Sequence, residues 1–382
     1  MRKLVNLGGS ALAALAFAGL ATESTLAHRP ITSKYTYNAD VFPIVRDRCG
    51  RCHVAGGAAP MSLLSYKDAV PWAESLREEL TAERMPPWYV DEESAPIRGG
   101  RSLTAREIDT IVTWATGGTP EGDAAKRPAP VSVSTDWPAG PPDLVIAMDA
   151  GYTVPAETQD ETHTFTLATG WRETRWVKAA DLLPGTPSMV RDATIAVEDG
   201  PVLAAWVPSH ETGGAPEGMA FRLPAGARLA VRIHYKKSWQ DEHTAKSDRS
   251  AIGLYVTGAP APGHELREMI TSGSMVLADQ TTIVAIRPEL DRPYAAIDVH
   301  ALLAGGGRVP LLRLRAPRPE WARRYWLASP VDLPRGSRIE VVTTAASTGA
   351  EAFPADPDVS GRGAAAPAQP GAPRIRLDVV SR

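Results

Sequence analysis

The spacing of hydrophobic and polar positions changes partway along the chain. In the first third, the stretches NADVFPIVRDR and SLTAREIDTIVTWATGG carry apolar residues at helical spacing, among them Phe42, Val45, Ile108 and Ile111. From about residue 140 onward, short β-branched or alternating stretches are separated by turn residues, as in HTFTLAT, RWVKAADLL, TIAVED and RLAVRIHYKKSW. The pattern predicts a small all-α domain followed by an all-β region.

Local signals predict where these parts begin and end. Thr104 and Glu107 have the spacing of a capping box at a helix start, and Gly117 and Gly118 provide a helix end. The Pro/Gly-rich stretch GTPEGDAAKRPAPVSVSTDWPAGPPD follows and reads as a connection between domains. We therefore expect the helical domain over residues 35–125 and a linker over 126–140.

The β region contains two similar sequence segments. FRLPAGARLAVRIHY is followed much later by VDLPRGSRIEVVTTA, and both read as a turn feeding a strand. This predicts two similar β-sandwiches, over residues 141–260 and 265–382. PADPDVSGRGAAAPAQPGAP is expected to be a flexible insertion before a last strand, RIRLDVV.

The N-terminus has the features of an export signal. Arg2 and Lys3 precede a short apolar run that ends near Ala27, which predicts a signal peptide over residues 1–27. An uncleaved anchor is disfavoured because the run is short and interrupted. The mature chain is then expected in the periplasm without a stable membrane span. Lys and Arg total 41 against 44 Asp and Glu with no basic run, which disfavours a nucleic-acid partner.

Both cysteines of the chain lie in CGRCH, as Cys49 and Cys52, with His53 directly after them. A disulfide, a redox dithiol or half of a zinc site are alternatives. No second CxxC or HxxxH is present for zinc, and the neighbouring sequence is helical, whereas a thioredoxin-like motif needs a βαβ setting. In an exported chain, CxxCH favours covalent attachment of one haem c, with His53 as the proximal iron ligand.

A distal ligand is expected from RMPPWYV. Two prolines follow Met85 and stiffen the loop that would present the thioether. Met61 is the rival, but little chain separates it from His53, and core filling is the alternative role for Met85. His/Met ligation is typical of electron-transfer cytochromes.

Nearly the whole mature chain carries a family resemblance. The segments YNADVFPIVRDRCGRCH, APMSLLSYKDAVPWAESLREEL, RMPPWYV and RSLTAREIDTIVTWATGGTPEGD resemble cytochrome c domains at the front of some exported bacterial proteins. The second half of those proteins is similar to copper type II, ascorbate-dependent monooxygenases of the peptidylglycine hydroxylating family. The resemblance implies two jelly-roll-like sandwiches, each with one copper site. It also implies haem thioether bonds at Cys49 and Cys52, with His53 proximal and Met85 distal.

The chain departs from that family at the copper ligands. Arg191 and Asp192 stand where a histidine pair would fall, and His234 of that site remains. At the second site His300 remains, a leucine replaces its partner histidine, and the expected methionine is missing. A single imidazole does not hold copper tightly, so copper binding is disfavoured and both histidines are expected to be structural. His28 would become the N-terminus after cleavage, where its imidazole and α-amino group could chelate copper.

These features predict a periplasmic monohaem cytochrome that passes single electrons to a redox partner protein, with the β region used for docking. A copper- and haem-dependent monooxygenase is one alternative. A haem-containing binding or scaffold protein is the other.

Overall fold

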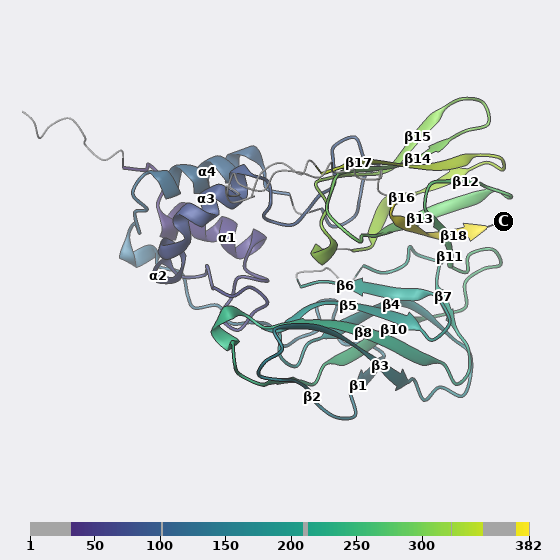
Figure 1. Ribbon diagram of the computed structural model, residues 1–382, viewed down its shortest axis with the longest axis horizontal. Coiled ribbons are helices and arrows are strands. Elements are labelled where there is room, and N and C mark those ends of the chain that lie inside the picture. Colours follow the sequence, from purple (N-terminus) through teal and green to yellow (C-terminus); the bar gives the residue numbers. More distant parts are fainter. Residues whose placement is uncertain (1–31, 101, 209–212, 322, 347–371, 382) are drawn as a thin grey trace, which may run out of the picture.

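The computed structural model describes residues 32–100, 102–208, 213–321, 323–346 and 372–381. The predicted signal peptide over 1–27, His28 and most of the predicted insertion lie outside the described residues. The helical N-terminal part lies to one side of two stacked β bodies (Figure 1). The prediction of a β region after residue 140 is confirmed.

Short helices make up the N-terminal part. They are η1 (Tyr37–Val41), α1 (Phe42–Arg48), α2 (Tyr66–Ala69), η2 (Val70–Trp72), α3 (Ala73–Thr81) and α4 (Ala105–Thr116), with η3 (Ala124–Lys126) after them. The Thr104 side chain accepts from the Glu107 amide and the Glu107 side chain accepts from the Thr104 amide, so the predicted capping box is present. These helices share one apolar core, in which Tyr37, Ile111 and Trp114 are fully buried.

Two four-stranded antiparallel sheets enclose the first β core. One has the order β1-β10-β4-β7 and the other β3-β8-β5-β6, with a small β2-β9 pair beside them. The strands are β1 (Leu144–Ala147), β2 (Tyr152–Val154), β3 (Asp160–Ala168), β4 (Arg175–Leu183), β5 (Val190–Val197), β6 (Val202–Trp206), β7 (Phe221–Leu223), β8 (Arg228–Lys236), β9 (Lys246–Asp248) and β10 (Ala251–Thr257). The short helix η4 (Trp239–Asp241) lies between β8 and β9.

The second β core is enclosed in the same way, by sheets of order β11-β18-β13-β16 and β12-β17-β14-β15. The strands are β11 (Arg267–Thr271), β12 (Ser274–Val276), β13 (Thr281–Glu289), β14 (Tyr294–Leu302), β15 (Arg308–Arg315), β16 (Tyr325–Leu333), β17 (Arg338–Ala345) and β18 (Arg374–Ser381), with η5 (Pro319–Trp321) before β16. Once β2 and β9 are set aside, the strands of the two sandwiches follow the same order through their sheets. The second sandwich therefore repeats the topology of the first.

The two similar sequence segments form equivalent turns in the two sandwiches. Gly226, between β7 and β8, and Gly336, between β16 and β17, have φ of 72° and 82°, a conformation that favours glycine. In each case the turn carries the chain from one sheet of its sandwich to the other.

Two contacts between the parts were not apparent from the sequence. The segment between α3 and α4 lies against the second sandwich, with bridges from Val90 to Leu314 and from Ile97 to Leu327. The two sandwiches also share buried apolar surface: Val284, Ala285, Trp326 and Val380 of the second belong to the core cluster of the first. Among the described residues, no helix is both long and apolar enough to cross a membrane.

Candidate haem site

The CxxCH segment forms a tight turn directly after α1. The Cys52 and His53 amides both donate to the Cys49 carbonyl, at 3.1 and 2.9 Å. These bonds bring the two thiols and the imidazole onto one turn, and the cysteines are not joined to each other. Burial raises the pKa of Cys49 to about 12, so this cysteine is a protonated thiol rather than the thiolate of a reactive redox pair.

The His53 ring is oriented by the backbone of the following loop. Its Nδ1 lies 3.3 Å from the Met61 carbonyl oxygen, and because a carbonyl only accepts, Nδ1 carries the hydrogen. Burial lowers the pKa of His53, which favours the neutral imidazole. The Nε2 lone pair is then directed away from Met61. This is the arrangement that orients metal-binding histidines in proteins.

The two candidate methionines occupy different places. Met61 follows His53 closely, and its carbonyl lies behind the ring, on the Nδ1 side. Met85 lies on a separate loop after α3, is half-buried, and its amide donates to the Glu79 carbonyl at 3.4 Å. The fold thus places Cys49, Cys52 and His53 together and leaves Met85 on another loop.

This donor set fits a c-type haem. Two thiols and a neutral imidazole on one turn are the groups used for covalent haem attachment and proximal ligation, and a methionine thioether is one of the usual second ligands. The loop closes over the motif at Gly57, where an added Cβ would lie 2.5 Å from the Cys52 carbonyl oxygen.

The first sandwich contributes an arginine to the CxxCH loop. Arg191 of β5 is half-buried and its guanidinium donates to the Ala58 carbonyl, five residues beyond His53. Burial lowers the pKa of Arg191, and a smaller electrostatic effect of Cys52 opposes this shift. Arg191 therefore links the first sandwich to the candidate haem loop.

The second sandwich holds the Met85 loop in a parallel way. Arg323, just before β16, donates to the Pro87 carbonyl at 3.0 Å, and its guanidinium lies over the Trp88 ring at 5.6 Å. Trp88 in turn packs edge-on against Tyr325, at 5.9 Å between ring centroids. The sequence did not predict either arginine contact, because each one joins segments that are far apart in the chain.

The first residual copper position is occupied by an ionic cluster. His234 Nδ1 lies 2.7 Å from Asp192 and Nε2 lies 2.8 Å from Asp160. Hydrogen bonding to Asp192, and then to Asp160, raises the pKa of His234 against the opposing effect of burial. With a carboxylate on each ring nitrogen, the histidine is stabilised as an imidazolium, which has no lone pair for copper.

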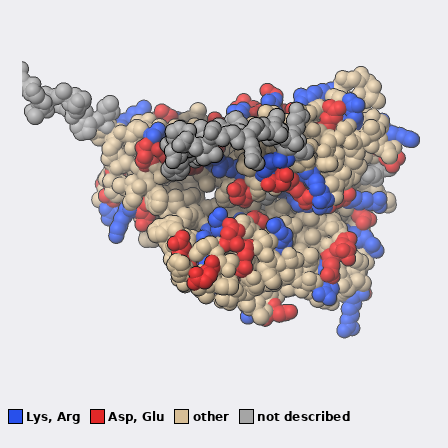
Figure 2. All heavy atoms as spheres, viewed as in Figure 1, with Lys and Arg blue, Asp and Glu red and all other residues tan. Residues whose placement is uncertain are grey.

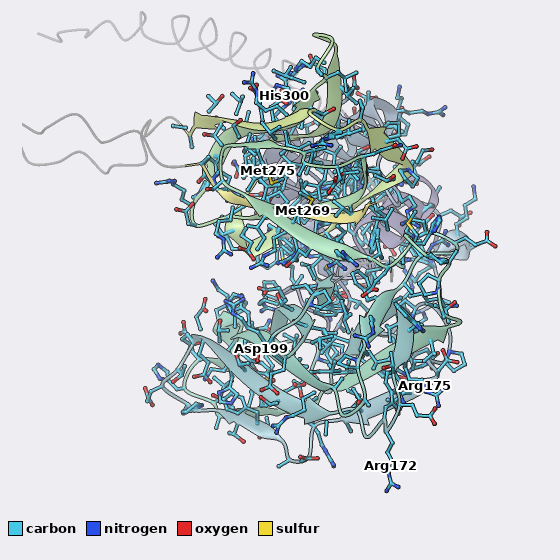
Figure 3. The ribbon with its side chains drawn as sticks, turned by 90° about the vertical axis from the view of Figure 1, so that its right-hand side faces the viewer. Arg172, Arg175, Asp199, Met269, Met275 and His300 are labelled. Atoms are coloured by element: carbon cyan, nitrogen blue, oxygen red, sulfur yellow. The ribbon has the colours of Figure 1, made fainter. Side chains whose placement is uncertain are left out.

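Carboxylates also flank the histidine at the second position. His300 lies on β14, with Nδ1 3.0 Å from Asp298 and Nε2 3.3 Å from Glu340. It lies on the side of the second sandwich that faces away from the first, as Figure 3 shows. The fold does not bring His234 and His300 to one site. Across the described ranges, no group of three His, Cys, Asp or Glu side chains is placed to hold a metal.

Comparisons with known proteins give no family for this chain. No model of a known protein family matches the sequence, and no curated protein matches it. Among solved structures, a Paenibacillus xanthan lyase is 11% identical with a TM-score of 0.16; the match covers 68% of this chain and 27% of the lyase. The turret protein A223 of Sulfolobus turreted icosahedral virus is 6% identical with a TM-score of 0.14, over 62% of this chain and 98% of that one. The chain thus spans about a quarter of the lyase, and similarities at this level carry no argument about fold or function.

Proposed function

We propose that this protein is a periplasmic monohaem c-type cytochrome that passes single electrons to a redox partner. Its helical part is a cytochrome c domain in this proposal, and its β region is a pair of jelly-roll-like sandwiches. The observation that carries the proposal is the turn in which two cysteines, not joined by a disulfide, precede a histidine whose Nδ1 is hydrogen-bonded to the Met61 carbonyl.

Each residue of the turn has a defined part. Cys49 and Cys52 would form the thioether bonds, His53 would bind iron through Nε2, and Met85 would bind on the opposite face. A haem held in this way supplies one-electron oxidation and reduction and leaves no open position for substrate. The Met61 carbonyl keeps the imidazole in one tautomer and one orientation. The position of Met61 behind the ring supports Met85 as the distal ligand.

The β region supports the cytochrome part through its two arginine contacts. Arg191 donates to the loop after His53 and Arg323 donates to the loop after Met85, so each sandwich contacts the loop next to one of the proposed axial ligands. Arg191 also places a positive charge near Cys52, which favours the reduced state of a nearby haem. A copper monooxygenase is disfavoured because carboxylates occupy both nitrogens of His234 and of His300.

The test is production of the full chain in bacteria with a working haem-maturation system. We expect haem that stays attached after denaturation, its loss in Cys49→Ala and Cys52→Ala, and a methionine–iron charge-transfer band in the oxidised wild type. Met85→Ala should remove this band and keep the covalent haem, whereas the matched variant Met61→Ala should retain the band. A colourless wild-type protein would overturn the proposal, and loss of the band in Met61→Ala alone would overturn the assignment of Met85.

A further inference from the structure

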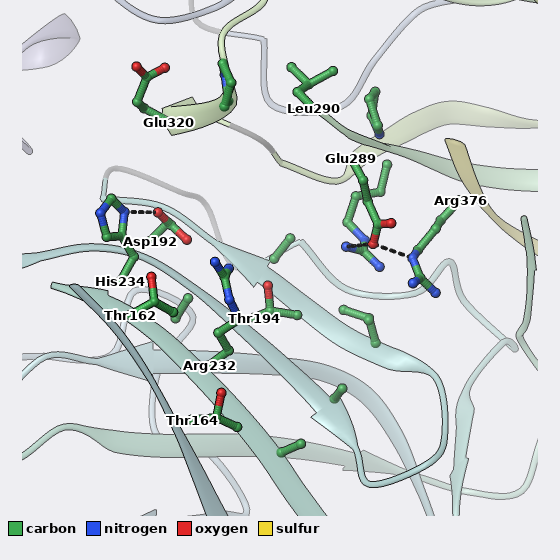
Figure 4. A pocket seen from close by; sticks show the side chains of 18 residues that line it. Thr162, Thr164, Asp192, Thr194, Arg232, His234, Glu289, Leu290, Glu320 and Arg376 are labelled. Atoms are coloured by element: carbon green, nitrogen blue, oxygen red, sulfur yellow. Dashed lines mark hydrogen bonds and ion pairs between the residues drawn. The ribbon is translucent and has the colours of Figure 1, made fainter. Parts of the chain in front are cut away.

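A cavity of about 750 Å³ lies between the two sandwiches. Its floor is the outward face of the sheet β3-β8-β5-β6, and the opposite wall comes from β13, β18 and η5 (Figure 4). Acidic and basic side chains gather along the boundary between the two sandwiches (Figure 2). Neither the cysteines nor the candidate axial ligands line this cavity, so it is separate from the proposed haem site.

Arg232 stands at the centre of the floor. It pairs across the sheet with Thr164 on β3 and with Thr194 on β5, and cross-strand neighbours present their side chains on the same face. Figure 4 shows the Arg232 side chain directed into the cavity between the two threonines. One guanidinium and two hydroxyl groups therefore form a continuous polar row.

This row lacks partners within the described part of the chain. Neither the Arg232 guanidinium nor the hydroxyls of Thr164 and Thr194 make a hydrogen bond or ion pair with another described residue. The other two arginines of the cavity differ, because Arg287 and Arg376 are each paired with glutamates. Among the described residues, Arg232 is thus the cavity arginine without an acidic partner.

The surroundings restrict what that ligand can be. A guanidinium fork flanked by hydroxyl donors suits a planar carboxylate, which accepts two parallel hydrogen bonds. Two of the carboxylates that line the cavity are already paired, Asp192 with His234 and Glu289 with Arg287 and Arg376. Among the described residues, Arg232 therefore offers one uncompensated positive charge, which matches a singly charged anion, and the nearby Glu320 carboxylate disfavours a second negative charge. Leu290 and Pro288 provide apolar surface for an organic group, and the volume greatly exceeds that of an inorganic ion.

We propose that this cavity binds a small organic monocarboxylate, with its carboxylate on Arg232, Thr164 and Thr194. The site adds ligand binding to the electron-transfer role and does not depend on it, since it uses no residue of the proposed haem site. It would give the β region a function of its own.

The test is isothermal titration calorimetry of the full chain at pH 7 with D-gluconate, benzoate and inorganic phosphate at millimolar concentrations. We expect saturable binding of at least one of the two carboxylates and weaker or no binding of phosphate. Arg232→Gln should weaken carboxylate binding by roughly 10- to 100-fold, because charge-assisted hydrogen bonds are lost. Arg232→Lys, which keeps the charge but not the fork, should show an intermediate loss.

The matched control is Arg222→Gln. Arg222 is an exposed arginine on β7, in the other sheet of the same sandwich, and its replacement should leave binding unchanged. The proposal is overturned if neither carboxylate binds the wild type, or if phosphate binds more tightly than both. It is equally overturned if Arg232→Gln binds as the wild type does, or if Arg222→Gln loses as much affinity.

Discussion

Arg324 joins the two sandwiches through a buried ionic contact. Its Nε lies 2.8 Å from Asp378 on β18, and both side chains are almost fully buried, at 2% and 3% exposure. The same guanidinium donates to the Leu203 carbonyl at 2.7 Å and to the Val202 carbonyl, both on β6 of the first sandwich. One side chain thus satisfies a buried carboxylate and two carbonyl groups at the interface.

Replacement of Arg324 by methionine would remove all of these donors while filling much of the same volume. Breaking a buried ion pair from one side costs about 3 to 5 kcal/mol, because the remaining charge has no partner. Burial already raises the pKa of Asp378 to about 6 with the arginine present, so without it Asp378 would become protonated near pH 7. Protonation of Asp378 limits the electrostatic part of the destabilisation. The two carbonyl groups that lose their hydrogen-bond donors increase the total destabilisation. We expect Arg324→Met to lower the free energy of unfolding by about 4 kcal/mol.

Urea unfolding followed by tryptophan fluorescence measures this quantity. A double-mutant cycle with Asp378→Asn separates the ionic part, because the second substitution removes the stranded carboxylate. The double variant should therefore be less destabilised than the sum of the two single variants. Arg228→Met is the control: its pair with Glu198 is exposed, and it should cost less than about 1 kcal/mol. A loss below about 1 kcal/mol in Arg324→Met, or strict additivity in the cycle, would refute the reasoning.

Three further predictions concern pH, helix capping and the haem environment. Because the pKa of Asp378 is raised to about 6, the folded state takes up a proton there at a higher pH than the unfolded chain does. Lowering the pH from 7 to 4 should therefore stabilise the wild type by about 2 kcal/mol relative to Asp378→Asn. A difference in urea unfolding that does not change with pH would contradict this. Thr104→Ala removes the hydroxyl that accepts from the Glu107 amide at 3.2 Å, and should cost about 1 kcal/mol in the same assay; an unchanged midpoint would count against the capping role. In haem-loaded protein, Arg191→Gln removes a positive charge near Cys52. This should lower the reduction potential by on the order of tens of millivolts in a redox titration. An equal or higher potential would refute the prediction.

The two arginine contacts connect the helical part to both sandwiches of the β region. Arg191 and Arg323 come from different sandwiches and bond to the loops that follow His53 and Met85. A change in the relative position of the sandwiches would therefore act on both loops together. The cavity around Arg232 lies at the same boundary between the sandwiches.

Local features of this protein were determined by the sequence alone. The capping box at Thr104 and the glycine turns at Gly226 and Gly336 depend on residues close together in the chain, and each was predictable. The period-two pattern of strands such as β8 reports burial on one face, and needs no knowledge of the partner strand. The CxxCH motif is likewise local, because its chemistry requires only three side chains on one turn.

Tertiary structure alone decided which distant groups meet. The carboxylates on His234, the contact of Arg191 with Ala58 and the position of Arg232 between two threonines depend on strand register and on the packing of separate sheets. No periodicity encodes these contacts, since a shift of one residue in register would send each side chain to the opposite face. The sequence could therefore show which histidines are present, while the fold was needed to see that carboxylates lie on both ring nitrogens of His234 and of His300.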